Sequence, residues 1–411
     1  MDKKYILDSK ENREFLSEGA KSLLEFGRNY PSPKGSSYYL GSDGTPIKER
    51  NRETWITARM VHVYAIGKML GFEWCSDLAE AGLKGLIDEL RDKEKGGWYA
   101  GLTSNDEIVP GKQCYAHAFV ILAASSALLA GIKGAEALLS DALNVFESRF
   151  YDEKEGMALD GWDTLFTVPD DYRGLNANMH TVEAFLAAAD ALSDEKYRIR
   201  AGRIIDRTLV FAKNNGYRLP EHYTKDWVPE IELNKDRPDD PFKPYGATPG
   251  HGIEWARLIT EWCLSTFKGE EGKEKRDHYI REASALYDRA VSDGWNSDGA
   301  PGIVYTTGWD GKPVVSDRMH WTLAEAINTS AVLYRTTGDE KYASQYASFL
   351  QYLDEFVLDH STGSWFHQLD NNNVLKETVW PGKPDIYHAF QAMLIPYAKT
   401  ELSIAKAVSL G

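Results

Sequence analysis

The stretch YAHAFVILAASSALL (115–129), like MHWTLAEAINTSAVL (319–333), combines helical periodicity with many alanines and other small apolar residues. A helix of this composition can pack against neighbours on several sides. Two other helical stretches, EKYRIRAGRIIDRTLVF (195–211) and KEKRDHYIREASALYDRA (273–290), carry one charged face, which is typical of helices that cover a core and face solvent. The alternation of the two kinds predicts an inner and an outer layer of helices.

Helical periodicity recurs along the whole chain, with the two kinds of helix in alternation. The segments that we expect to be helical span approximately 10–28, 53–71, 75–91, 113–130, 134–150, 176–192, 195–214, 251–268, 273–293, 319–337, 340–357 and 385–400. Helices in two alternating layers predict a series of about six helix pairs.

The loops before several inner helices share one plan. Each has a glycine, an aromatic or β-branched pair, a polar turn and a β-like run with valine, as in 96–117, 301–321 and 363–388. This order indicates a β-hairpin that leads into an inner helix. Divergent copies are GMALDGWD (156–163) and GYRLPEHYTKDW (216–227).

Five of the ten histidines recur at intervals of 63 to 71 residues, each at or near the start of an expected helix. Repeats of this length suit a helix–loop–helix unit. If the pairs close into a ring, these histidines converge at the end where the hairpins gather. The five are His117, His180, His251, His320 and His388. We therefore predict an all-α (α/α)6 barrel, a toroid of six helix pairs with short β-hairpins at the active-site rim, and residues 1–411 as a single domain.

Composition excludes several classes of partner. The formal charge is −15, which argues against nucleic acid or an anionic membrane, because both require a basic face. No apolar run approaches the roughly 20 residues that span a bilayer, and the first residues do not resemble a signal peptide. The three cysteines are far apart and form no disulfide framework. We expect a soluble cytoplasmic protein, either a monomer or a homo-oligomer.

Motifs for the common cofactors are missing from the sequence. There is no helix-opening GxGxxG after a strand, no P-loop and no His/Cys set with zinc spacing. A GxSxG nucleophile elbow is also absent. We therefore expect neither a nucleotide cofactor nor a metal.

His251 lies in YGATPGHGIEW (245–255), where the Pro-Gly pair indicates a helix start. Glu254 follows three residues later and so shares a helical face with His251. A carboxylate there can fix the tautomer of the imidazole or bind a substrate hydroxyl. A neutral imidazole in a pocket suits proton transfer near neutral pH. The alternative is a histidine packed at the helix start, with Glu254 as a capping acid.

Two other histidines also share a helical face with a polar residue. Asn176 precedes His180 by four residues, and Asp385 precedes His388 by three. Polar residues on the face of an inner helix indicate a cavity, because unpaired polar groups are costly in a core. The alternative is a hydrogen-bonded structural cluster.

Arg59, in WITARMVHVY (55–64), is a charged residue on an otherwise apolar helix. A buried arginine needs either a substrate oxygen or an ion-pair partner. Further candidates for the pocket on other inner helices are Tyr115, His117, Trp321 and Glu325, although core packing is the preferred interpretation for Tyr115 and His117 and suits Trp321 equally well. The histidines without a surrounding motif are His62, His222, His278, His360 and His367, for which we expect surface or structural roles.

Segments spread over nearly the whole chain resemble the N-acylglucosamine 2-epimerase superfamily. Within it the similarity is greatest to the bacterial aldose–ketose isomerases, which include mannose and sulfoquinovose isomerases. The matching segments are WITARMVHVY (55–64), GGWYA (96–100), DDYRGLNANMHTVEAF (170–185), PGHGIEW (249–255), DGKPVV (310–315) and GKPDIYH (382–388).

The resemblance implies an (α/α)6 barrel and cofactor-independent proton transfer next to the carbonyl of a monosaccharide. By position it implies that His251 and His388 form the acid–base pair, with Arg59 on the carbonyl or enediolate oxygen. The same resemblance implies that His180 and Glu254 orient the substrate and the histidine. It implies that Asn176 and Trp321 contact the sugar.

One departure from the family pattern limits the choice of substrate. The sulfosugar branch carries glutamine two residues before the isoleucine of the last motif, where this chain has Pro384, which cannot donate a hydrogen bond. This favours a neutral sugar, D-mannose to D-fructose, with D-lyxose to D-xylulose as a side activity. The alternatives are a sugar 2-epimerase of the mannose/glucose or cellobiose type, a sulfoquinovose isomerase, an inverting glycosidase and a non-catalytic sugar-binding protein.

Overall fold

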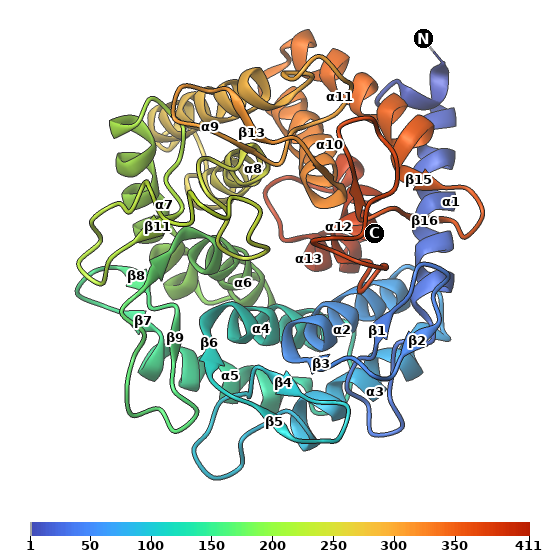
Figure 1. Cartoon of the computed structure of the whole chain (residues 1–411), viewed down its shortest axis with the longest axis vertical. Coiled ribbons are helices and arrows are strands. Elements are labelled where there is room, and N and C mark those ends of the chain that lie inside the picture. The colour runs from blue at the N-terminus through green and yellow to red at the C-terminus, as the bar shows by residue number, and fades with distance from the viewer. Residues whose placement is uncertain (1) are drawn as a thin grey trace.

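The computed structural model describes residues 2–411, which form two concentric rings of helices (Figure 1). The inner helices are α2 (Thr54–Met69), α4 (Cys114–Leu129), α6 (Leu175–Leu192), α8 (Pro249–Thr266), α10 (His320–Thr337) and α12 (Tyr387–Ala392). The outer helices are α1 (Lys10–Gly27), α3 (Cys75–Asp88), α5 (Ala135–Arg149), α7 (Glu195–Asn214), α9 (Lys273–Gly294) and α11 (Glu340–Tyr352). The ring of six pairs confirms the predicted (α/α)6 barrel.

The two layers differ in burial as their composition predicts. Almost every residue of α4 is buried, whereas α7 buries one face and exposes charged side chains on the other. Each of the first five inner helices packs against the outer helix that follows it in sequence. The ring closes where α12 contacts α10, α2 and α1, so the two ends of the chain meet in one helix pair.

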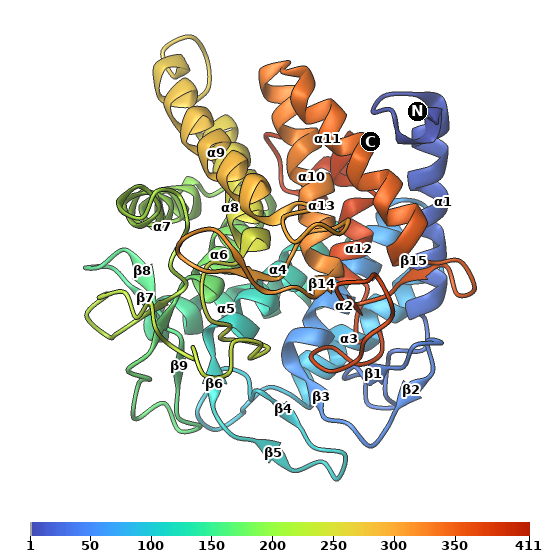
Figure 2. The same cartoon turned by 45° about the horizontal axis from the view of Figure 1, so that its top comes forward.

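The strands are short, and most of them lie at one end of the helices (Figure 2). Hairpins within one loop are β1 (Tyr39–Leu40) with β2 (Pro46–Ile47), β4 (Gly101–Leu102) with β5 (Ile108–Val109), β7 (Tyr151–Asp152) with β8 (Met157–Ala158), β12 (Thr306–Thr307) with β13 (Pro313–Val315), and β15 (Leu358–Asp359) with β16 (Ser364–Trp365). All of these pairs are antiparallel.

A second set of strand pairs joins neighbouring units of the ring. The strand that precedes an inner helix pairs with the loop that precedes the next inner helix. These pairs are β3 (Arg52–Glu53) with β4, β6 (Lys112–Gln113) with β9 (Gly161–Trp162), β10 (Arg173–Gly174) with β11 (His222–Tyr223), and β14 (Arg318–Met319) with β17 (Gln368–Leu369). We call this set of inter-unit pairs the rim belt.

The rim belt also supplies hydrogen-bond acceptors for the starts of the inner helices. No side chain caps α2, α4, α6, α8 or α10, yet the first amides of a helix have no partner within it. Carbonyls of the next unit accept instead, as in the bonds from Cys114 N to Asp160 O, Leu175 N to Glu221 O and His320 N to His367 O (2.8, 3.0 and 3.1 Å). In α8 the first residue is Pro249, which has no amide to satisfy.

The last expected helix is shorter than its sequence pattern predicts. Residues 385–400 were expected to form one helix, but α12 ends at Ala392 and a 3₁₀ turn follows at Ile395–Tyr397. Pro396 lies in this turn and cannot continue an α-helix. The chain then forms α13 (Ile404–Ser409), which contacts α2, α4 and α6. Similarly, α11 ends at Tyr352 and continues as a π-helical turn over Leu353–Val357.

Among residues 2–411, none of the helices is both long enough and apolar enough to cross a lipid bilayer.

One glycine of the outer layer, because it has no side chain, allows a rim loop to pack closely against the barrel. In α3, a Cβ on Gly85 would overlap the backbone of Gly35 and Ser36. The same loop donates a hydrogen bond from Ser37 N to Thr57 Oγ1 of α2 (2.9 Å). Close contact at Gly85 therefore joins α3, the loop and the helix that carries Arg59.

We predict that Gly85→Ala destabilises the protein by about 1–3 kcal/mol through overpacking, although alanine is the better helix former. Thermal unfolding followed by circular dichroism should show the lower midpoint. Lys84→Ala is the matched control, because Lys84 is the exposed neighbour on the same helix, and its midpoint should stay near that of the original protein. An unchanged or higher midpoint for Gly85→Ala would show that the loop is not in close contact with α3.

Candidate active site

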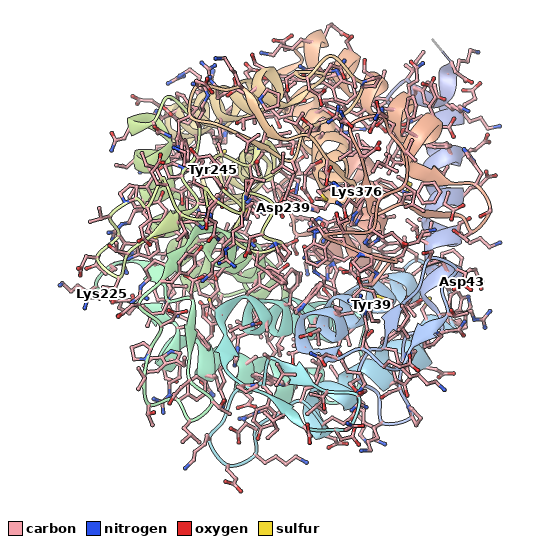
Figure 3. All side chains as sticks on the ribbon, viewed as in Figure 1. Tyr39, Asp43, Lys225, Asp239, Tyr245 and Lys376 are labelled. Atoms are coloured by element: carbon pink, nitrogen blue, oxygen red, sulfur yellow. The ribbon has the colours of Figure 1, made fainter. Side chains whose placement is uncertain are left out.

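A pocket lies at the hairpin end of the barrel, and all six inner helices or their first turns contribute to it. Its lining from these helices comprises Trp55, Arg59, Tyr115, Asn176, His180, His251, Glu254, His320, Trp321, Asp385 and His388. Loop residues complete the wall, among them Phe242, Tyr305, His367, Trp380 and Pro384. Charged side chains lie on the surrounding loops, for example Lys376, which pairs with Asp317 at 2.8 Å (Figure 3).

His388 is held by a carboxylate on the neighbouring helix. Its Nδ1 lies 3.1 Å from Glu325 Oε1, and its Nε2 lies 3.5 Å from Arg59 Nη2. Burial, together with the positive charge of Arg59, lowers the pKa of His388 well below its usual value. The imidazole is therefore neutral and donates from Nδ1 to Glu325, so that its Nε2 carries the lone pair and accepts from Arg59 Nη2 at the edge of the pocket.

His180 has a similar arrangement on α6. Its Nδ1 lies 3.1 Å from Glu183 Oε2, and Tyr387 and Gln391 donate to the other oxygen of Glu183. Burial lowers the pKa of His180. Burial alone would raise the pKa of Glu183, but the contacts with His180, Arg257 and Tyr387 together outweigh it and the pKa is lowered. His180 is thus a second neutral imidazole backed by a carboxylate.

His251 stands at the start of α8 against an aromatic surface. Its ring packs on Trp321 with centroids 4.8 Å apart and planes at 32°. Its Nδ1 lies 3.1 Å from Glu221 Oε1, although the pair lacks the alignment of a hydrogen bond. Glu221 is buried and directly precedes strand β11 of the rim belt, and its carbonyl also accepts from the first amide of α6. The belt thus places an acid directly beside His251.

Arg59 reaches the pocket from α2 as a buried cation. Its Nη1 lies 3.2 Å from Asp385 Oδ2, and its Nη2 donates to Tyr115 Oη at 2.7 Å. The guanidinium also lies over the rings of Phe119 and Tyr387, 4.4 and 4.6 Å from their centroids. Burial acts to lower the pKa of Arg59, but Tyr115 and Asp385 outweigh it. Arg59 therefore stays charged beside the pocket.

Glu254 is buried, yet neither of its carboxyl oxygens has a hydrogen-bond partner within the protein. Burial, followed by the nearby Glu325 charge, raises the pKa of Glu254 well above its usual value. A neutral carboxylic acid results, which can donate as well as accept. Asn176 Oδ1 is also buried without a partner. Both side chains line the pocket and are free to bind hydroxyl groups of a ligand.

Two groups of side chains have the donor types and spacing of a metal site. They are His180, Glu183 and Glu254, and Glu254, Glu325 and His388, each with ligand atoms within 4.8 Å of one another. In both groups the histidine is already hydrogen-bonded to a carboxylate of the same group. Each of these histidine–carboxylate pairs could therefore bind a metal ion or, without one, transfer protons as an acid–base pair.

The structure brings most of the expected residues together, with two differences. His117 lies outside the pocket, because its Nε2 accepts from Trp98 N at 3.0 Å and its ring packs on Phe150. Glu325, expected on the substrate, lies behind His388 with its oxygens bonded to His388 and Arg257. Both side chains are saturated by protein partners.

Several pocket residues were missed by the sequence analysis. His367, expected to be structural or at the surface, is buried in the pocket wall and stacks on His320 with centroids 3.6 Å apart. Trp380 forms edge contacts with Trp55 and Phe242. No local motif marks these residues, because their partners lie on other units of the ring.

The fold and the site together define an enzyme of the sugar isomerase and epimerase class. Residues 35–392 match the N-acylglucosamine 2-epimerase (GlcNAc 2-epimerase) family, and the chain belongs to this family. It is 39% identical to a D-mannose isomerase of Pseudomonas cannabina pv. alisalensis over 98% of this chain and 97% of the relative. A D-mannose isomerase of Thermobifida fusca is also 39% identical, with 97% of both chains covered.

Solved structures show the same architecture. The crystal structure of a D-mannose isomerase superposes with a TM-score of 0.85 at 28% identity, covering 95% of this chain and 98% of that one. A cellobiose 2-epimerase from Spirochaeta thermophila superposes with a TM-score of 0.79 at 19% identity, covering 94% and 96%. The second similarity concerns the fold alone.

His117 provides a test of how burial affects acid stability. Burial lowers the pKa of His117 to about 3, whereas an unfolded histidine titrates near 6.5. Below pH 6.5 the unfolded state therefore binds a proton that the folded state does not, so stability falls as the pH is lowered toward the folded pKa. We predict that the stability advantage over His117→Gln shrinks by about 1.4 kcal/mol per pH unit below 6.5.

Urea unfolding of both proteins at pH 7, 6 and 5 measures this difference. The free energies of unfolding should differ most at pH 7 and approach each other at pH 5. A constant difference across this range would mean that His117 titrates normally in the folded protein.

Proposed function

We propose that this protein is an aldose–ketose isomerase that interconverts D-mannose and D-fructose, with D-lyxose and D-xylulose as a side activity. The observation that carries the proposal is the neutral His388, with Nδ1 bound to Glu325 and Nε2 directed to a pocket shared with His251 and Arg59. In this proposal the reaction uses no metal and no cofactor.

The reaction moves two protons within the sugar. After the ring of the aldose opens, a histidine removes the proton from C2, and the C1 carbonyl oxygen gains negative charge and takes up a proton, which gives the cis-enediol. The cis-enediol then receives a proton at C1, while O2 loses its proton and becomes the carbonyl oxygen of the ketose. His251 and His388 serve as the pair, one on carbon and the other on oxygen. Histidine acid–base catalysis of this kind contributes about 10² to 10⁴ in rate.

Arg59 is suited to stabilise the negative charge that develops on the carbonyl oxygen of the sugar. It is buried and positively charged, and a preorganised cation in a pocket closed to water stabilises a developing oxyanion. His180 and the neutral acid of Glu254 orient the open sugar, with Asn176 on its hydroxyl groups. Trp321 gives the sugar an apolar face next to His251.

D-Mannose is favoured over other sugars on two grounds. Two relatives at 39% identity over nearly the full chain are D-mannose isomerases. Pro384 lines the pocket, and its ring nitrogen offers no hydrogen for a sulfonate group. The glycosidase alternative is disfavoured, because Glu254 and Glu325 place oxygens within 4.8 Å of each other, closer than the roughly 6.5–9.5 Å of an inverting pair.

The test is an NMR time course of the purified protein with D-mannose in D2O and EDTA. We expect D-fructose to appear, with deuterium incorporated at C1 as the enediol exchanges with solvent. D-Glucose as the main product would instead make the protein a 2-epimerase. Activity only with sulfoquinovose would reassign the substrate, and loss of activity in EDTA would overturn the metal-free mechanism.

Substitution of the acid–base residues should abolish turnover without unfolding the protein. We predict that His251→Ala and His388→Ala each lower kcat by about 10²-fold or more, and that Arg59→Ala also lowers it. His278→Ala is the control, because His278 is exposed on α9 and its loss should leave kcat unchanged. Near-normal turnover by either active-site histidine variant would exclude that residue from the acid–base pair.

A further inference from the structure

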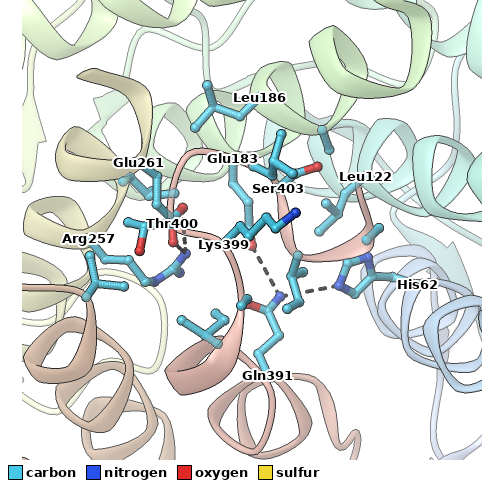
Figure 4. A pocket seen from close by; sticks show the side chains of 18 residues that line it. His62, Leu122, Glu183, Leu186, Arg257, Glu261, Gln391, Lys399, Thr400 and Ser403 are labelled. Atoms are coloured by element: carbon cyan, nitrogen blue, oxygen red, sulfur yellow. Dashed lines mark hydrogen bonds and ion pairs between the residues drawn. The ribbon is translucent and has the colours of Figure 1, made fainter. Parts of the chain in front are cut away.

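Arg257 lies on the side of the site that faces away from the pocket. It is on α8, is 2% exposed, and lines a separate cavity at the other end of the barrel (Figure 4). This cavity has a volume of about 30 Å³ and is smaller than the sugar pocket, which has a volume of about 70 Å³. Arg257 is not part of the wall of the sugar pocket, so any effect on the reaction must pass through another residue.

The guanidinium of Arg257 contacts three carboxyl groups. Its Nε donates to Glu325 Oε2 at 2.8 Å, and its Nη1 donates to the two oxygens of Glu261 at 3.3 and 3.4 Å. Its Nη2 lies 3.6 Å from Glu254 Oε1. The other oxygen of Glu325 lies 3.1 Å from His388 Nδ1. Arg257, Glu325 and His388 therefore form one chain of contacts that ends at the pocket.

Arg257 has a specific effect on the charge of Glu325. Burial raises the pKa of Glu325, and Arg257 is the strongest influence in the opposite direction. The neighbouring Glu254 and Glu261 compete for the same cation, and burial raises the pKa of Glu261 to about 7. Without Arg257, burial would raise the pKa of Glu325 further and would favour its protonated form.

We infer that Arg257 is a positioning residue that keeps Glu325 ionised, and that it thereby determines which ring nitrogen of His388 carries the proton. An ionised Glu325 only accepts, so His388 must donate from Nδ1 and keep its lone pair on Nε2, which lies 3.5 Å from Arg59 Nη2 and can serve as the base. A protonated Glu325 would instead donate to Nδ1, and the proton of a neutral His388 would move to Nε2, where it blocks the base. The consequence for turnover rests on the proposed function, whereas the consequence for the tautomer does not.

The tautomer of His388 can be measured without any sugar. We expect ¹⁵N NMR of histidine-labelled protein near pH 7.5 to show the Nδ1–H form of His388, with the signal assigned by comparison with His388→Asn. In Arg257→Met the Nε2–H form should dominate. An unchanged Nδ1–H form in Arg257→Met would overturn the inference, whatever the protein does to mannose.

Turnover provides an independent test through a double-mutant cycle. Arg257→Met should lower kcat about 10- to 100-fold, as is typical for groups that orient a functional residue from behind it, with a smaller effect on KM. Because Arg257 acts through Glu325, the Arg257→Met/Glu325→Gln double variant should be no slower than Glu325→Gln alone. Multiplicative losses would show that Arg257 acts by another route and would overturn the inference.

Arg198 offers a matched control for the loss of a buried arginine. It is on α7, is 6% exposed and pairs with Asp190 and Glu195, but it has no contact with the sugar pocket. Arg198→Met should lower stability while kcat and the His388 tautomer stay unchanged. If Arg257→Met does not fold, Arg257→Gln removes the charge while keeping a hydrogen-bond donor, and the same change of tautomer is expected.

If the original protein does not convert mannose, the proposed function fails while the tautomer experiment still decides the role of Arg257. If mannose is converted but Arg257→Met retains both its rate and the Nδ1–H tautomer, the proposed function stands and the positioning role of Arg257 is wrong.

Discussion

The first amide of a buried helix must find an acceptor, and in this barrel most of the inner helices find it in the next unit of the ring. Side chains do not cap these helices, so the loop carbonyls of the rim belt take that role. These hydrogen bonds join the start of each such helix to the loop of the next unit in the ring. Loops and helix starts are therefore positioned together, at the end of the barrel where the pocket lies.

Residues that supply these carbonyls also build the pocket. The carbonyl of Glu221 accepts from the start of α6, while its carboxylate reaches His251 on α8. The carbonyl of His367 accepts from His320, and its ring stacks on that same residue. The backbone hydrogen bonds that satisfy the first amides of the helices therefore also orient side chains of the pocket, such as those of Glu221 and His367.

Buried charge is the second constraint on this site. Acidic side chains outnumber the arginines around the floor of the pocket, so some must be neutral and others need a partner. Glu183 and Glu325 are each hydrogen-bonded to a histidine, whereas Glu254 has no hydrogen-bond partner and holds a proton. Glu183 and Glu325 thus hold His180 and His388 by Nδ1, and a neutral acid remains for the ligand.

Much of this could be predicted from the sequence because it depends on local spacing. Helical periodicity marks both layers, and pairs three or four residues apart, such as His251 with Glu254, share a face in any helix. The same reasoning could not decide between core and pocket for His117, whose ring nitrogen accepts from the backbone of Trp98, and it overlooked His367, Glu221 and Arg257. The sequence alone determined the layers, the repeat and the residues that each inner helix presents near its start. Only the tertiary structure decided which of them reach the pocket and which histidine nitrogen is free, because hydrogen bonds and buried charges join residues from different units of the ring.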